Sequence, residues 1–158
     1  MRIGRTLPPT AAPVGCHEVL AGAAGLIAGN RSFDRLAAEI RAELGVDRVF
    51  LVSSGKAALT LTLSAIASLS PARRNVVIPA FTCFSVPAAV LQAGLQPVVC
   101  DVDVETFDFD YAQLASLLDE HMLCVVANHL FGIPAAVDRM RNWARRRYQT
   151  VMQRLACK

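Results

Sequence analysis

The sequence predicts a parallel α/β fold, in which short buried strands alternate with helices. Four apolar runs of strand length alternate with helical patterns along the chain, and this alternation is typical of parallel strands joined by right-handed helical crossovers. Hydrophobic residues make up 54% of the 158 residues and charged residues only 18%. That composition suits a sheet covered on both faces, or a piece whose partner surface is missing.

The first part of the chain is expected to be helical after an extended start. Residues 1–30 should form a proline-punctuated segment followed by a helix, rich in small residues, from Val14 to Ala28. Apolar positions then follow helical spacing from Phe33 to Leu44. Ser32 is the expected N-cap of this second helix, and Gly45 is expected to end it.

The remainder of the chain is expected to contain four strands, each followed by a helix. One of these helices is expected to begin with proline and to be followed by glycine, and another is expected to be capped by aspartate. The expected strands are 48–52, 76–78, 97–101 and 123–126; the expected helices are 56–69, 87–93 (begun by Pro87, followed by Gly94), 111–118 (capped by Asp110) and 135–147, the last with Val137, Met140 and Trp143 facing inward.

The turn Ser53-Ser54-Gly55-Lys56 joins the first expected strand to its helix. Ligands of parallel sheets bind outside the carboxyl ends of the strands, where this turn should lie. A glycine turn that enters a helix presents free N–H groups and the positive end of the helix dipole, which suit a phosphate. It is not a nucleotide P-loop, since Phe50 and Ala57 stand where that motif has glycine and a hydroxyl residue. A plain strand-to-helix turn is the alternative explanation.

Two further segments are expected at the same edge of the sheet. Residues 78–85 contain Cys83, and residues 128–134 contain His129. A Cys–His pair for nucleophilic catalysis stays open, beside the alternative of a packed loop and a structural histidine. The acidic loop 101–110 lacks the turn glycine and the terminal glutamate of an EF-hand, so a solvated loop with a helix cap explains it better than a metal site.

Composition also limits the compartment and the partners. Five cysteines show no C-x-x-C pair, which favours the reducing cytoplasm. Prolines interrupt the N-terminal segment and no apolar run reaches the length of a membrane span, so neither export nor a membrane partner is expected. The net charge is +3, and the arginines of the last helix lack the aromatic interleaving of a nucleic-acid module. No nucleic-acid partner is expected.

Taken together and in order, these segments resemble the pyridoxal-phosphate-dependent aminotransferases of the DegT/DnrJ/EryC1/StrS family, many of which act on nucleotide-linked keto sugars. The resemblance covers about residues 33 to 146. No single motif is diagnostic, but five in register with matching spacing are fairly specific. The motifs are SSGKAAL at 53–59, VIPAFT at 77–82, AGLQPVV at 93–99 with DVD at 101–103, TFDFD at 106–110 and HLFG at 129–132.

The resemblance implies a partial fold-type-I aminotransferase large domain over residues 31–147, truncated and followed by an aberrant tail at 148–158. It implies that Ser54-Gly55-Lys56 holds the phosphate of pyridoxal 5'-phosphate, with Lys56 in place of the family's usual threonine. It places Cys83 where a ring that stacks on the pyridine is common. Complete relatives are usually homodimers and take a nucleotide sugar or another small phosphorylated substrate.

Two functional groups of the family have no counterpart in the sequence. Residues 148–158 carry no acidic residue that could pair with the pyridine nitrogen, and neither Lys56 nor Lys158 fits the Schiff-base lysine. We therefore expect an N-terminal fragment of such an enzyme, from a truncated or frameshifted gene, with no catalytic residue and no activity alone. The alternative is a non-catalytic phosphate-binding or interaction module that pairs with a full-length relative.

The absence of a suitably placed lysine leads to a chemical prediction. Borohydride reduction of the chain in excess pyridoxal phosphate should give no stoichiometric adduct, because no amine is positioned to hold the cofactor aldehyde. Mass spectrometry of the reduced chain checks this. Full labelling of Lys56, together with turnover of a keto sugar, would contradict it.

Overall fold

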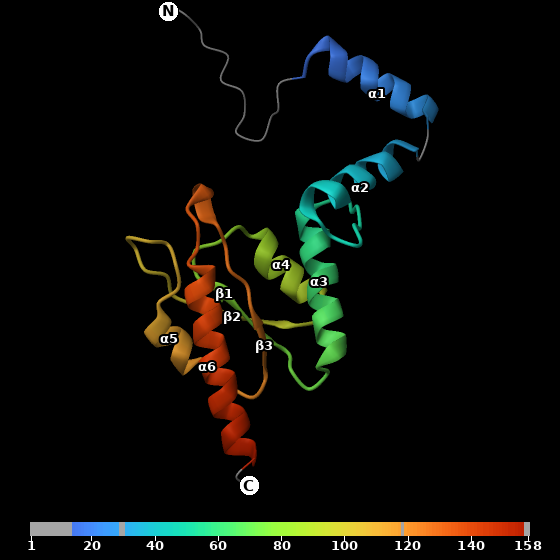
Figure 1. Ribbon diagram of the computed structural model, residues 1–158. Helices are drawn as coiled ribbons and strands as arrows, with labels where there is room; N and C mark the ends of the chain where they lie inside the picture. Colours follow the sequence, from blue (N-terminus) through green and yellow to red (C-terminus); the bar gives the residue numbers. More distant parts are fainter. Residues whose placement is uncertain (1–13, 29–30, 118, 157–158) are drawn as a thin grey trace, which may run out of the picture. The chain divides into compact units, whose positions relative to one another are not determined.

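The computed structural model describes residues 14–28, 31–117 and 119–156 (Figure 1). The chain divides into two compact units, Met1–Leu51 and Val52–Lys158. The first unit contains two helices and the second contains the sheet, so the two are described separately. No helix within the described ranges is long and apolar enough to cross a membrane.

The first unit contains α1 (Cys16–Ala28) and α2 (Arg31–Leu44). Gly45 follows α2 with φ +61°, the left-handed conformation that glycine adopts at helix ends, so the predicted stop is confirmed. The predicted N-cap is wrong, because α2 begins at Arg31 and Ser32 lies inside its first turn. A cap needs a non-helical backbone, and sequence patterns locate helix ends only to within a residue or two.

The strand expected at residues 48–52 is absent, and these residues have an irregular backbone. An apolar β-branched run predicts a strand only where a neighbouring strand supplies hydrogen-bond partners. None of the strands within the described ranges pairs with residues 48–52. The predicted four-strand sheet is therefore corrected to three strands.

The sheet of the second unit is parallel, in the order β2-β1-β3. Its strands are β1 (Asn75–Pro79), β2 (Gln96–Cys100) and β3 (Met122–Val125). β1 is central, with a parallel neighbour on each side. Three of the predicted strands and their parallel arrangement are thereby confirmed.

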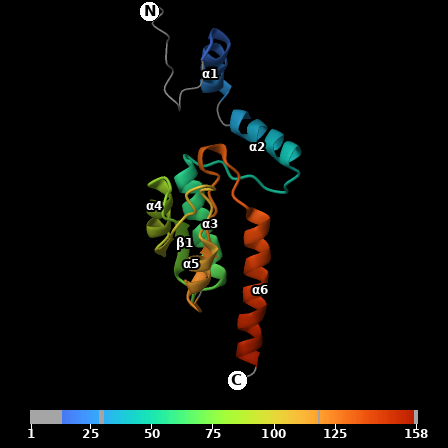
Figure 2. The same cartoon turned by 90° about the vertical axis from the view of Figure 1, so that its left-hand side faces the viewer.

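Both faces of β1 are buried. Side chains of a strand alternate between its two faces, so Val76 and Ile78 enter one apolar cluster and Val77 the other, all at 2% exposure or less. The first cluster includes Leu63 of α3 and Val90 of α4. Residues from α5 and α6 join the second, and Figures 1 and 2 show α3 and α4 side by side.

The helices of the second unit follow the predicted order with shifted ends. α3 (Gly55–Leu69), α4 (Ser85–Gln92), α5 (Tyr111–Ser116) and α6 (Val137–Ala156) alternate with the strands, and a short 3-10 helix, η1 (Leu130–Gly132), precedes α6. Asp110 caps α5 through its Oδ1, which accepts N–H groups from Ala112 and Gln113 at 2.8 and 3.2 Å. Gly94, at φ +71°, follows α4 as predicted.

Two of these helix predictions need correction. α4 begins two residues before Pro87, at Ser85, because proline is tolerated anywhere in a first turn, where N–H groups have no intrahelical acceptor. α6 buries Met140 as predicted and packs Trp143 partly against the core, but Val137 remains 38% exposed. Val137 is the first residue of α6, and it lies before the part of the helix that packs against the second apolar cluster.

A buried side chain, that of Asp108, joins the acidic loop to α5 and to the residue that precedes α6. Asp108 is 9% exposed, and its Oδ1 accepts the Phe109 N–H at 2.9 Å. Its Oδ2 accepts the Tyr111 hydroxyl at 3.2 Å and the Ala136 N–H at 3.3 Å. Burial and the nearby Asp108 raise the pKa of Tyr111 to about 12. Tyr111 therefore donates to Asp108 throughout the neutral range.

α3 provides a matched pair of residues that tests the assignment of the core. Leu63 is 1% exposed and Leu69 of the same helix is 84% exposed. Leu63→Ala should lower the free energy of unfolding by about 2–5 kcal/mol, because it leaves a cavity against the sheet. Leu69→Ala should change it by less than about 0.5 kcal/mol. Urea denaturation followed by circular dichroism measures both, and equal losses would contradict this core.

Candidate functional site

The turn before α3 forms a helix N-terminus that is capped by one serine. Ser54 is extended, with φ −165° and ψ 160°, and is the N-cap of α3. Its hydroxyl oxygen accepts the Ala57 N–H at 3.2 Å, and its carbonyl accepts the Ala58 N–H at 3.0 Å. The cap therefore satisfies the third and fourth N–H groups of the helix.

The first two N–H groups of α3 remain available to a ligand. Within the residues that the structure describes, no acceptor lies in hydrogen-bond range of the N–H groups of Gly55 and Lys56. Both point out of the helix end that carries the positive pole of its dipole. Lys56 is exposed and adds a positive charge. These residues fit a phosphate group.

The backbone conformation does not require glycine at position 55. Gly55 is the first residue of α3 and does not have a left-handed backbone, so a positive φ is not required there. A Cβ built at Gly55 would meet no atom within 4 Å. The space around this Cβ position is therefore open, and a side chain there would not clash with the described residues.

The loops after the three strands lie at one edge of the sheet, because parallel strands end on the same side. A hydrogen bond from the Asn128 amide to the Thr82 hydroxyl joins the loop after β1 to the loop after β3. Helix α3 leads into β1, so its N-terminus faces this same edge. The edge therefore carries all the segments that were predicted to form a site.

Cys83 lies in the loop after β1 and is exposed. Its sulfur accepts a hydrogen bond from the Ser85 hydroxyl at 3.1 Å. This bond, together with the Ser85 backbone N–H, lowers the pKa of the Cys83 thiol. A thiol offers no aromatic face, so the part of the site at Cys83 fits a pyridine ring poorly.

His129 makes a structural hydrogen bond. Its Nδ1 accepts the Ala135 N–H at 3.0 Å, a bond that orders the chain before α6. No hydrogen bond between Cys83 and His129 occurs in the described part of the chain. The bond to Ala135 supports the structural alternative for His129, and no Cys–His hydrogen bond is formed among the described residues.

The acidic loop after β2 uses its carboxylates to shape the backbone. Asp103 Oδ1 accepts the N–H groups of Glu105 and Thr106 at 3.0 and 2.9 Å and the Thr106 hydroxyl at 3.0 Å. The bonds from the Thr106 backbone and hydroxyl, followed by that from Glu105, lower the pKa of Asp103. The expected solvated loop with a helix cap is what the structure contains.

Three aromatic rings meet at this edge, one from each loop. Phe81 follows β1, Phe107 follows β2 and Phe131 lies in η1 after β3. Their ring centroids are 6.0, 6.2 and 6.3 Å apart, and we call them the phenyl cluster. The sequence analysis did not bring these rings together. Their only signal was the presence of phenylalanine in each segment that follows a strand, two in each of the first two segments and one in the third.

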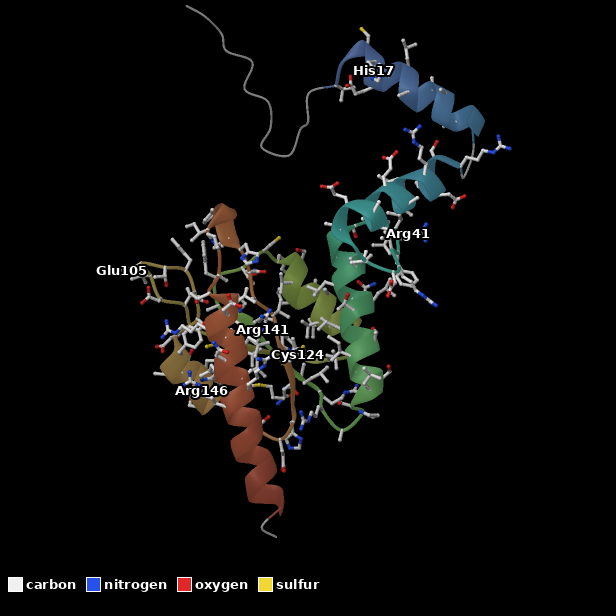
Figure 3. The ribbon with its side chains drawn as sticks, viewed as in Figure 1. His17, Arg41, Glu105, Cys124, Arg141 and Arg146 are labelled. Carbon is white, nitrogen blue, oxygen red and sulfur yellow. The ribbon has the colours of Figure 1, made fainter. Side chains whose placement is uncertain are left out.

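The arginines of α6 are partly engaged within the chain. The guanidinium of Arg139 lies over the Tyr111 ring, 4.0 Å from its centroid, a cation–π contact. Arg141 pairs with Asp138 at 3.3 Å. Figure 3 labels Arg141 and Arg146 on α6 and Glu105 in the loop after β2. Two of the arginines of α6 therefore interact with residues of the same chain.

Cys83, in the loop after β1, differs from the two thiols of the sheet. Burial raises the pKa of Cys124, and burial with Asp110 and Asp101 nearby raises that of Cys100 to about 11. Ser85→Ala should raise the pKa of Cys83, because the thiolate loses a hydrogen-bond donor. The pH dependence of iodoacetamide alkylation, measured on the Cys83 peptide by mass spectrometry, reports this shift.

Ser64→Ala is the matched control for this measurement, since the Ser64 hydroxyl donates to the Thr60 carbonyl within α3. The control should leave the alkylation profile of Cys83 unchanged. An unchanged profile in Ser85→Ala would show that the hydroxyl does not stabilise the thiolate.

The chain resembles known aminotransferases in sequence. The DegT/DnrJ/EryC1/StrS aminotransferase family profile matches residues 16–154. L-glutamine:2-deoxy-scyllo-inosose aminotransferase of Streptomyces paromomycinus is 33% identical over 112 residues, 71% of this chain and 26% of that protein. dTDP-4-dehydro-2,3,6-trideoxy-D-glucose 4-aminotransferase of Saccharopolyspora spinosa is 30% identical over 135 residues, 84% of this chain and 34% of that protein. The chain spans about a third or less of the length of these relatives.

Solved structures share the fold. The sugar aminotransferase CalS13 from Micromonospora echinospora is 25% identical with a TM-score of 0.74, over 85% of this chain and 37% of that one. AtS13 from Actinomadura melliaura has a TM-score of 0.77 at 24% identity, over 90% of this chain and 39% of that one. The predicted α/β fold class is confirmed. The family profile, which spans most of the described residues, shows that this chain belongs to the DegT/DnrJ/EryC1/StrS aminotransferase family.

Proposed function

We propose that this chain binds the phosphate of pyridoxal 5'-phosphate at the N-terminus of α3, as part of an aminotransferase that acts on a nucleotide-linked keto sugar. One observation carries the proposal: the N–H groups of Gly55 and Lys56 have no acceptor among the described residues, beside an exposed lysine. Membership of the family supports the choice of pyridoxal phosphate among phosphate-bearing ligands.

Each residue of the turn has a distinct role in this proposal. Ser54 closes the helix end and so keeps the first two N–H groups aimed outward. Gly55 leaves room for the phosphate oxygens, and Lys56 adds a charge that attracts them. Bound pyridoxal phosphate supplies the electron sink that amino transfer requires. The protein residues of this turn hold its anionic end.

The remainder of the site limits how tightly this chain binds the cofactor. Cys83 is exposed and provides no ring to stack on a pyridine. Lys56 lies at the phosphate end of the site, away from the position of an amine that would react with the cofactor. We therefore infer that the chain alone binds weakly and transfers no amino group. A non-catalytic phosphate-binding module would use the same N–H groups and is the second candidate.

The proposed setting is the reducing cytoplasm. Cys16, Cys83, Cys100 and Cys124 are free thiols, which accords with a reducing compartment. The proposed partners are a nucleotide-sugar substrate and, as the resemblance implies, a second subunit.

The turn can be tested by titration with inorganic phosphate and with pyridoxal phosphate, followed by NMR of the backbone amides. The amides of Gly55, Lys56 and Ala57 should shift and saturate. Gly55→Val should abolish this response, because its side chain fills the approach to the N–H groups. Lys56→Thr should weaken binding only about two- to fivefold and reduce its salt dependence, because it removes one charge.

Two control variants separate the turn from general effects. Gly22→Val adds the same side chain at another helical glycine with open space around it. Arg145→Thr removes an exposed charge on α6. Neither should change the response. Unmoved amides at Gly55 and Lys56, with binding lost in Arg145→Thr, would refute the proposed site.

A further inference from the structure

We propose that a cavity in the first unit binds a small zwitterion, namely a free amino acid with an apolar side chain. The cavity lies between α2 and residues 47–50 and has a volume of about 330 Å³. Sites for small molecules in proteins are typically about 300–1,000 Å³, so this volume suits one small ligand. Every residue that lines the cavity belongs to the first unit, whereas the phosphate site at α3 belongs to the second. The inference therefore does not depend on the proposed function.

The helix α2 and the chain that follows it supply the two walls of the cavity. Asp34, Ala37 and Arg41 have the spacing i, i+3, i+7, which places them on one face of α2. The chain reverses after the helix, where the Val46 N–H donates to the Arg41 carbonyl at 3.2 Å. Residues 47–50 then form the other wall. Figure 3 labels Arg41, which lies in the last turn of α2.

Two acidic and two basic side chains line the cavity, namely those of Asp34, Asp47, Arg41 and Arg48. Among the described residues, none of these four side chains forms an ion pair or a hydrogen bond within the chain. On another face of the same helix, Arg35 does pair with Glu39, at 2.8 Å. The charges of the cavity are therefore available to the groups of a ligand, and hydrogen bonds between charged partners are stronger than those between neutral ones.

The arrangement of these charges favours a zwitterion over a simple ion. Two carboxylates and two guanidinium groups give the cavity wall no net charge. Asp47 directly follows Val46, whose N–H is bonded to Arg41, so Asp47 and Arg41 are neighbours, yet they form no ion pair in the described part of the chain. An amino acid carries an ammonium and a carboxylate on one carbon atom. The ammonium can donate to Asp47 while Arg41 donates to the carboxylate, whereas a simple cation or anion would leave one of these two residues without a partner.

The apolar part of the wall indicates the side chain of the ligand. Ala37 and Val49 line the cavity and are partly buried, and Phe50 beside them is 79% exposed although its side chain is large and apolar. An apolar side chain packed against Phe50 would remove this surface from water, which is favourable. An acidic side chain, such as that of glutamate, would instead place a second carboxylate against the apolar wall and lose hydration. The cavity therefore suits an amino acid such as phenylalanine.

The first test compares four probes on the full wild-type chain by NMR of the backbone amides. L-Phenylalanine should shift the amides of residues 47–50 in a saturable way. Hydrocinnamate lacks the ammonium and phenethylamine lacks the carboxylate, so each should bind roughly tenfold more weakly, the loss expected for one charge-assisted hydrogen bond. L-Glutamate should also bind roughly tenfold more weakly, because of its second carboxylate. Binding of any of these three analogues as tight as that of L-phenylalanine, or the absence of a shift at residues 47–50, would overturn the inference.

A matched pair of variants tests the role of Arg41. Arg41→Gln should weaken the binding of L-phenylalanine roughly tenfold, because it removes the partner of the ligand carboxylate. Arg35→Gln makes the same substitution on the same helix, outside the cavity, and should leave the binding unchanged. Equal losses in the two variants would contradict the assignment. The amides of Gly55 and Lys56, followed with phosphate in the same samples, report the α3 site independently, so the two proposals can fail separately.

Discussion

The burial of β1 on both faces is the constraint on which the second unit depends. Val76, Val77 and Ile78 are at most 2% exposed, and because side chains alternate along a strand, three consecutive residues supply two separate cores. Helices must cover both faces of such a strand, and parallel neighbours must satisfy its backbone on both edges. The carboxyl ends of all three strands, with their loops, are thereby brought to one edge.

Much of this second unit could be predicted from local sequence patterns. The three strands are short apolar runs between turn residues, and Asp110 and Gly94 mark helix ends by their side-chain chemistry and backbone freedom. The failures concern information that is not local. Residues 48–52 have a strand-like composition, but a strand is defined by its neighbour. Val137 has the correct helical spacing for burial, but it precedes the part of α6 that packs on the core.

The candidate site shows the same division. The glycine turn at Gly55 predicted a helix N-terminus with free donors, because the first N–H groups of any helix lack intrahelical acceptors. The capping bond from the Ala57 N–H to the Ser54 hydroxyl was not predicted. The phenyl cluster could not be predicted, since it requires three loops to converge and two phenylalanines to adopt a left-handed backbone. The Cys83–His129 pair, which the sequence left open, depends in the same way on how the loops converge. Both residues reach one edge, but His129 Nδ1 accepts the Ala135 N–H, and no hydrogen bond joins the two side chains in the described part of the chain.

Asp108 has a consequence for the dynamics of this layer. Its carboxylate accepts N–H groups from Phe109 and Ala136, which are 1 and 28 residues away from it in the sequence, and the hydroxyl of Tyr111. If the segment before α6 detached alone, a buried acceptor would lose one of its donors, which is costly in an apolar surrounding. We therefore expect the acidic loop, α5 and the entry to α6 to open together, and the amides of Phe109 and Ala136 to exchange their hydrogens together.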